Sequence, residues 1–237
     1  MTIEKSENAE EVLNSPTATP CPTGLNEDAA LALLKNGDLS AEEVEELSKN
    51  SAVMSSRKVR LAMASHSRTP RRIALRLIRE LYTFDLVQYS QMPAAPADLK
   101  RAADDLLVTR LSSISLGERI SLARRSSANV VSALLADKEP TVWQPALENP
   151  RLTEAAVAKA LRRGATAAFV EAVSHHAKWS LRADIRIALL RNAHTPLARA
   201  LEFARRLPPA QLRDVLHASR LPEQVKTYLR RELESRS

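Results

Sequence analysis

The chain reads RKVRLAMASHSRTPRRIALRLIREL over residues 57–81 and ADIRIALLRNAHTPLARALEFARRL over residues 183–207. Placing Ile185 on Val59 gives an offset of 185 − 59 = 126. Further identical residues coincide at this offset: Arg186 with Arg60, Thr195-Pro196 with Thr69-Pro70, Ala200-Leu201 with Ala74-Leu75 and Pro222 with Pro96. Repetition at one offset predicts stacked units, because a single unit cannot bury its own apolar face.

The likeness extends through residues 179–233 in one copy and residues 57–107 in the other. A third copy begins at Val142, at an offset of 142 − 59 = 83, where Asn149 falls on His66. We therefore expect one repetitive architecture to cover most of the chain.

Local signals in the first copy predict helices. Thr69-Pro70 matches a helix start, with threonine as the N-cap and proline at N1, where its missing N–H costs nothing. Ile73, Leu77 and Leu81 follow at helical spacing and indicate a buried stripe. We expect Leu75 and its equivalent Leu201 to fill matching core positions. The chain has only four glycines and no sustained alternation of polar and apolar residues, so the expected fold class is all-α.

Residues 1–24 contain three prolines within positions 15–22 and have few apolar residues to bury. This composition predicts a disordered, acidic, Pro/Thr-rich tail. Residues 25–237 are expected to form a single helical-repeat domain, an α-solenoid.

Charge is distributed unevenly along the chain. Residues 1–50 carry 3 − 11 = −8, whereas the whole chain carries +7, so residues 51–237 carry 32 − 17 = +15. A basic body with an acidic arm indicates a polyanionic partner, or an arm that masks the body.

The phrases Val59-Arg60-Leu61-Ala62 and Ile185-Arg186-Ile187-Ala188, each leading to a Thr-Pro pair, resemble the leucine-rich repeat variant. Residues 142–153 look like the same motif. This family comprises bacterial relatives of HEAT and armadillo repeats, and the likeness covers roughly residues 57–233. The resemblance implies a right-handed α-solenoid of HEAT-like helical pairs and says almost nothing about activity.

One member of that family is associated with a cysteine-bound iron–sulfur cluster. Cys21 is the only cysteine here, so this feature is not carried over and no cofactor is expected. A lone cysteine also fits a reducing compartment. Residues 1–7 lack the order of a signal peptide, and no apolar run approaches the ~20 residues that span a bilayer. We expect a cytoplasmic protein without membrane contact.

Arginines are the most prominent candidate binding residues. Arg72, Arg76 and Arg79 share one helical face. Arginine pairs recur later in the chain: Arg124-Arg125, Arg162-Arg163, Arg205-Arg206 and Arg230-Arg231. Such a stripe could follow phosphates or acidic peptides. The alternative is a solvated face whose arginine stems cover apolar surface.

Trp143 and Trp179 could stack on a base or a partner side chain, although packing between helices is the simpler interpretation. The densest cluster of titratable and aromatic side chains comprises His175, His176, Trp179 and His194. Adjacent histidines on a helix point about 100° apart, so a solvated or core role is favoured over a metal site.

His66, Asn149 and Asn192 occupy one repeat position, just before a turn. They could line one face as a ladder. Turn formation and capping of free carbonyls at helix ends explain these residue types more simply.

The sequence contains no recognisable catalytic motif, and we expect no catalytic, cofactor or metal residues. The favoured function is a non-enzymatic adaptor that binds a protein or acidic peptide along a basic solenoid face. The alternative is a nucleic-acid-binding HEAT-like protein. A DNA glycosylase-like enzyme using Trp143, Trp179 and Asp184 is less favoured. The candidate partner-binding residues are Arg72, Arg76, Arg79, Trp143, Trp179, Arg205 and Arg206. The oligomeric state is not predicted.

Overall fold

The computed structural model describes residues 25–35, 37 and 39–236. Regular structure in these residues is entirely helical, which confirms the all-α prediction. The expected tail, residues 1–24, lies outside the described residues. The helices are α1 (Glu27–Lys35), α2 (Ala41–Lys49), α3 (Ser51–Met54), α4 (Arg57–Ser65), α5 (Arg71–Glu80), α6 (Thr83–Gln91), α7 (Ala97–Arg110), α8 (Leu116–Arg125), α9 (Ala128–Leu134), α10 (Pro140–Leu147), α11 (Glu154–Arg162), α12 (Ala167–His175), α13 (Ala183–Leu190), α14 (Leu197–Arg205), α15 (Pro209–His217) and α16 (Glu223–Glu234).

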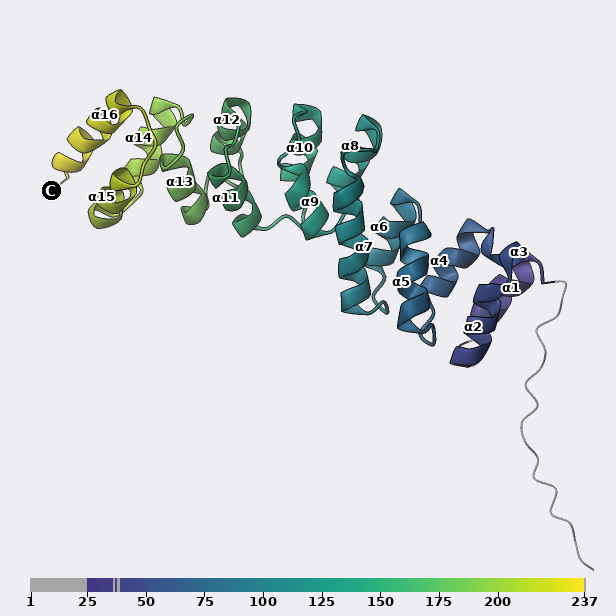
Figure 1. The fold of residues 1–237 in the computed structure, drawn as a ribbon. Coiled ribbons are helices and arrows are strands. Elements are labelled where there is room, and N and C mark those ends of the chain that lie inside the picture. Colours follow the sequence, from purple (N-terminus) through teal and green to yellow (C-terminus); the bar gives the residue numbers. More distant parts are fainter. Residues whose placement is uncertain (1–24, 36, 38, 237) are drawn as a thin grey trace, which may run out of the picture.

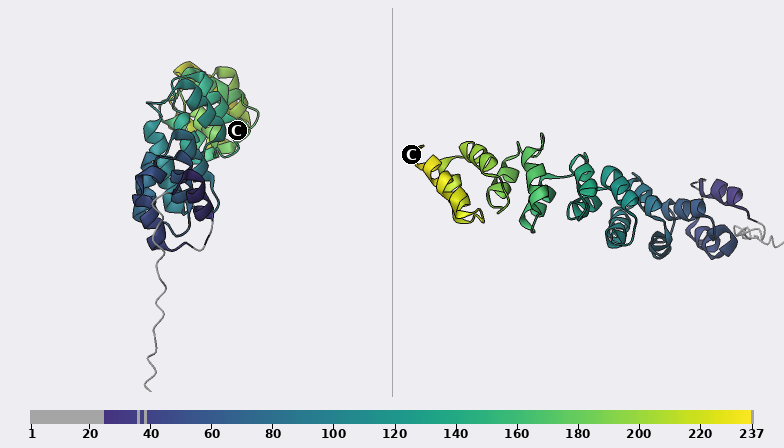
Figure 2. Two further views of the ribbon diagram at one scale, coloured as in Figure 1. Left: turned by 90° about the vertical axis from the view of Figure 1, so that its right-hand side faces the viewer. Right: turned by 90° about the horizontal axis from the view of Figure 1, so that it is seen from above.

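The helices follow one another in chain order along an elongated body, from α1 at one end to α16 at the other (Figures 1 and 2). Helices α5, α7, α9, α11, α13 and α15 each pack on the next and form what we term the odd row. The even row comprises α4, α6, α8, α10, α12, α14 and α16, with packing between α4 and α6, among α8, α10 and α12, and between α14 and α16. Strong packing among the described helices thus stays local in the chain.

Helix positions reproduce the repeat seen in the sequence. Helices α13, α14, α15 and α16 begin 126 residues after α4, α5, α6 and α7 (183 − 57, 197 − 71, 209 − 83 and 223 − 97). The two copies nevertheless occupy opposite rows, because α13 is 13 − 4 = 9 helices beyond α4 and an odd number of steps changes the row. Copies that align in sequence therefore face different sides of the molecule.

Equivalent positions of the two copies are buried alike. The side chains of Leu77 and Phe203, which coincide at offset 126, are both 0% exposed. Leu75 and Leu201 are also alike, but they are only half-buried at the edge of the core. The two leucines thus occupy matching positions, as expected, but at the edge of the core and not at its centre, because two residues along a helix turn the side chain about 200° away from Leu77 and Phe203.

The Thr-Pro pairs begin helices in a different way from the one expected. Pro70 and Pro196 are the N-cap residues of α5 and α14. The hydroxyl of Thr69 donates instead to the carbonyl of Met63 (2.5 Å), and that of Thr195 donates to Leu189 (2.6 Å). Each threonine thus satisfies a carbonyl at the end of the preceding helix, a group that α-helices leave unpaired.

A side chain that follows one helix also donates a hydrogen bond to a carbonyl near the end of the preceding helix of the same row. Asn149, which follows α10, donates from Nδ2 to the carbonyl of Ala123 in α8 (2.8 Å). Asn192, after α13, donates likewise to Leu161 in α11 (2.8 Å). Each asparagine Oδ1 also accepts a backbone N–H two residues on. We call these contacts carbonyl staples, and they agree with the capping interpretation of this repeat position.

Other side chains form equivalent hydrogen bonds to helix-end carbonyls elsewhere in the molecule. Ser219 Oγ, after α15, donates to the carbonyl of Leu190 in α13 (2.6 Å). Arginines and a tryptophan serve as further staples: Arg110 to Leu81 (2.7 Å), Trp179 to Leu147 (2.9 Å), Arg199 to Ser174 (2.9 Å) and Arg236 to Leu207 (2.8 Å). Short helices leave many free carbonyls, so this bonding links the units along both rows.

We expect Asn149→Ala to lower the free energy of unfolding by about 1–3 kcal/mol, because the buried carbonyl of Ala123 and the N–H of Arg151 both lose their partner. Denaturant melts measure this change. The control is Asn129→Ala, whose side chain is exposed and should change stability by about 0.5 kcal/mol or less. Equal effects of the two substitutions would contradict the staple.

The burial pattern also predicts a contrast between neighbouring core residues. Leu77→Ala and Phe203→Ala should each cost about 2–5 kcal/mol, because each leaves a cavity in the core. Leu75→Ala and Leu201→Ala should cost less, since half-buried side chains lose less apolar burial. Thermal or denaturant melts in which Leu75→Ala matched Leu77→Ala would refute this assignment of faces.

Candidate binding groove

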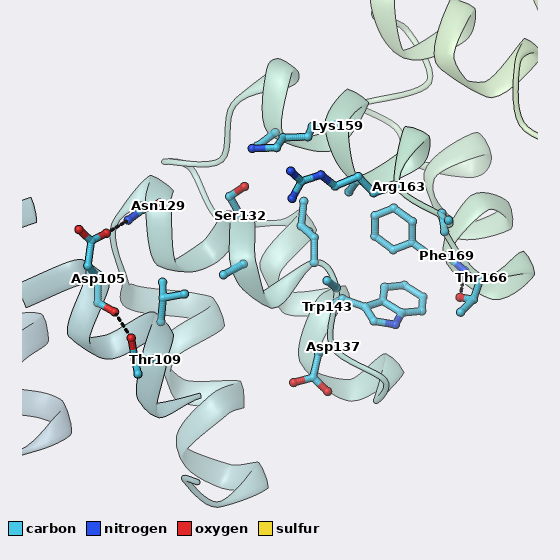
Figure 3. A pocket seen from close by; sticks show the side chains of 18 residues that line it. Asp105, Thr109, Asn129, Ser132, Asp137, Trp143, Lys159, Arg163, Thr166 and Phe169 are labelled. Atoms are coloured by element: carbon cyan, nitrogen blue, oxygen red, sulfur yellow. Dashed lines mark hydrogen bonds between the residues drawn. The ribbon is translucent and has the colours of Figure 1, made fainter. Parts of the chain in front are cut away.

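A hollow lies on the odd row, between α7, α9 and α11 (Figure 3). Its volume is ≈ 660 Å³, within the range of pockets that hold small ligands or peptide side chains. We call it the central groove. Three consecutive helices of one row form its walls, so the groove opens along the row.

One wall of the central groove is cationic. Lys159 and Arg163 lie four residues apart, at the end of α11, and their side chains are exposed toward the groove (Figure 3). Gly164 follows with φ of +91°, the conformation that lets the chain turn away after a helix. The ion pairs of the described residues involve other cations, so neither Lys159 nor Arg163 is neutralised by a described carboxylate.

The opposite wall is polar and carries an acid. Asp105 of α7 is exposed and accepts a hydrogen bond from Asn129 Nδ2 of α9 (3.2 Å; Figure 3). Asp137 also lines the groove, but it is paired with Arg119 (3.2 Å). The central groove therefore offers a positive wall and a negative wall at the same opening.

Trp143 forms part of the apolar floor of the central groove. Its ring meets that of Phe169 edge to face, with centroids 5.3 Å apart, and the residue is only 3% exposed. Trp179 is 1% exposed, and its Nε1–H donates to the carbonyl of Leu147. Both tryptophans are thus packing residues, as the simpler interpretation has it, and Trp179 presents no ring surface for a partner to stack on.

The first predicted arginine group lies on α5. Arg72 forms an ion pair with Glu45, and its hydrogen bond to that carboxylate lowers the pKa of Glu45. Arg76 approaches the carbonyl of Ser48 with Nη2 (3.4 Å). Arg79 is exposed. Two of these three side chains therefore tie α5 to α2.

The second predicted group lies at the end of α14. Arg205 pairs with Glu232 of α16 (3.3 Å), and Arg206 pairs with Glu202 (3.0 Å). Helix α14 belongs to the even row and α5 to the odd row, nine helices apart. The structure does not bring the two predicted groups together.

The histidine cluster is dispersed in the structure. His176 Nε2 lies 3.1 Å from Glu148 Oε1, His175 bonds its own helix, and His194 lines a different hollow. No three His, Cys, Asp or Glu side chains converge on a possible metal position in the described part of the chain. The lining of the central groove includes Trp143 but neither Trp179 nor Asp184, so the three residues weighed for glycosylase chemistry do not share it.

Asp104 is the one described carboxylate near the groove whose pKa is raised. Burial causes the increase, although hydrogen bonds from Ser127 Oγ (2.7 Å) and Ser90 oppose it. Its neighbour Asp105 faces the groove instead. The adjacent aspartates thus have different surroundings: Asp104 lies between packed helices, and Asp105 lies on the wall of the groove.

One feature of the sequence could have indicated the central groove. Lys159 and Arg163 are spaced i, i+4 immediately before a glycine, which places two cations on one face at a helix end. Of these two cations, only Arg163 was predicted from the sequence as a candidate, within the Arg162-Arg163 pair. Nothing local in the sequence shows that α7 supplies the facing wall.

Comparison of the chain with protein-family models, with curated proteins and with solved structures gives no match. Among the described helices, none is both long enough and apolar enough to cross a bilayer.

We expect Asp104→Asn to change how stability depends on pH. Burial raises the pKa of Asp104 above its ordinary 3.8, so the folded state holds this proton more tightly than the unfolded state does. The wild type should therefore lose stability relative to Asp104→Asn as pH rises from about 3.8 through the raised pKa. Denaturant melts at a series of pH values measure the difference.

Glu118→Gln provides a control of opposite sign. Hydrogen bonds from the backbone N–H and hydroxyl of Ser115 lower the pKa of Glu118. The stability that Glu118 contributes should be present above the unfolded pKa and lost as pH falls through the folded one. If both variants shifted in the same direction with pH, the assignment of causes would be wrong.

Proposed function

We propose that the chain is a right-handed α-solenoid of HEAT-like helical pairs, of the leucine-rich repeat variant type. Three observations support this proposal. Helices recur at offset 126, strong packing joins only helices close in the chain, and carbonyl staples repeat along the rows. Repeat arrays of this kind build extended surfaces from equivalent positions of successive units.

We further propose that the protein is a non-enzymatic adaptor that binds an acidic segment of a partner protein in the central groove. The observation that carries the proposal is the pair Lys159 and Arg163, which line a ≈ 660 Å³ groove and form no ion pair with a described residue. An acidic side chain of the partner would meet this wall. Exposed charges that lack partners are available to set specificity and association rate.

A peptide fits the groove better than a nucleic acid does. Asp105 stands on the wall opposite Lys159, and a sugar-phosphate backbone in the groove would approach that carboxylate. A peptide can instead place an acid on α11 and a donor on α7. Asn129 and Ser132 add groups suited to peptide amides. The net charge of +15 on residues 51–237 keeps nucleic acid as the second candidate.

We expect Lys159→Glu combined with Arg163→Glu to reduce partner capture at least about tenfold, since a buried acidic partner would meet repulsion. The melting temperature should stay within a few degrees, because exposed substitutions change stability little. Tagged wild type and variant are compared in parallel pull-downs from native lysate, with quantitative mass spectrometry.

Two further variants decide where the partner binds. Arg72→Glu combined with Arg206→Glu tests the residues predicted from the sequence. Arg182→Glu combined with Arg213→Glu reverses two exposed charges that lie outside the groove lining. Loss of capture only in the variant with Arg72→Glu and Arg206→Glu would place the site at the predicted arginines. Equal loss in all three double variants would indicate non-specific attraction.

A further inference from the structure

A second hollow lies farther along the odd row, where α11, α13 and α15 end. Its volume is ≈ 390 Å³, and its lining shares only Gly164 and Ala165 with that of the central groove. Arg162, Arg191, Arg220 and His194 line it, and its lining contains no Asp or Glu. We call it the arginine hollow. A concave site with three guanidinium groups and no carboxylate attracts an anion.

The arginines of this hollow are not used as carbonyl staples. Arg110, Arg199 and Arg236 donate to the carbonyls of helix ends elsewhere in the molecule. At the arginine hollow, Asn192 caps Leu161, and Ser219 caps Leu190. The guanidinium groups of the hollow therefore remain available for a ligand.

Small residues form much of the lining of the arginine hollow. Ala165, Ala188, Ala193 and Ala218 line it, together with Gly164. Larger side chains at these positions would reduce the volume of the hollow. The backbone N–H of Arg220 donates to the carbonyl of Arg191 (3.2 Å), which ties two of the lining residues to each other.

A purely structural role for these arginines also has a physical basis. Three helices end here, and cations stabilise the negative end of a helix dipole. However, side-chain or backbone donors already satisfy the carbonyls of Leu161, Leu190 and Arg191. Three cations in one hollow exceed what these capped ends require.

We propose that the arginine hollow binds a phosphate monoester dianion, presented as a phosphorylated side chain of the partner peptide. The location on a peptide rests on the proposed function, whereas phosphate binding itself does not. Guanidinium forks match the oxygens of a phosphate group, and a dianion gains more than a carboxylate from several arginines. Arginine clusters are a general means of reading phosphorylated segments.

The test uses O-phospho-L-serine as the probe, with L-serine as the unphosphorylated control, titrated into the ¹⁵N-labelled full chain at constant ionic strength. We expect backbone amide signals of Gly164, Arg191, Ala193 and Arg220 to shift with O-phospho-L-serine and not with L-serine. Inorganic phosphate should shift the same signals, because the phosphate group carries the recognition. Equal shifts with L-serine, or no shift with any probe, would overturn the proposal.

Matched variants distinguish a specific phosphate site from a general attraction to the positive charge of the chain. Arg191→Gln with Arg220→Gln should raise the Kd for O-phospho-L-serine at least about tenfold, since each lost charged hydrogen bond matters. Arg182→Gln with Arg213→Gln removes the same charge outside the hollow lining and should leave Kd within about twofold. Equal weakening by both pairs would refute a specific site. The amide spectrum of each variant verifies its fold.

Two more arms identify the source of the phosphate and separate this proposal from the adaptor proposal. Lys159→Glu with Arg163→Glu should leave the Kd for O-phospho-L-serine nearly unchanged while reducing partner capture. Phosphate binding without capture would then disprove the adaptor but not the hollow. Displacement of O-phospho-L-serine by an oligothymidylate that binds with steep salt dependence would assign the hollow to nucleic acid and overturn the peptide version.

Discussion

The free carbonyls at the ends of short helices are the constraint that organises this molecule. Every α-helix leaves its last four carbonyls without an intrahelical partner, and the described helices from α4 onward have only 7 to 14 residues. A large share of the backbone therefore needs donors from outside its own helix. Asn149, Asn192 and Ser219 supply them from the following helix of the same row. Hydrophobic packing holds neighbouring helices together, and this bonding sets their register.

The same constraint decides which charges reach the surface. Arg199 and Arg236 donate their hydrogen bonds to carbonyls of the preceding units. Where an asparagine or serine does the capping, nearby arginines such as Arg191 and Arg220 remain exposed. Exposed arginines without a described ion pair thus remain on the odd row between α11 and α15.

Local features of the fold were predictable from the sequence. Capping boxes at Ser40 and Ser115, and the buried stripe of α5, depend on residues three or four apart, and the structure contains both. The Thr-Pro pairs were misassigned, because the hydroxyl of Thr69 had two possible neighbours, the helix before it and the helix after it. Of the candidate site residues, Trp143 lines the central groove, and the arginines of α5 and α14 do not.

The sequence by itself determined that the chain is helical, that its helices recur at offset 126 and that positive charge gathers beyond residue 50. These properties are sums of local preferences, and they survive any arrangement of the helices. Only the tertiary structure decided which helices share a row, because nine helix steps separate α4 from α13 and reverse their sides. It also decided that Lys159 and Asp105 lie on opposite walls of one groove. Their placement depends on the packing of α7, α9 and α11, which no single segment of the chain determines.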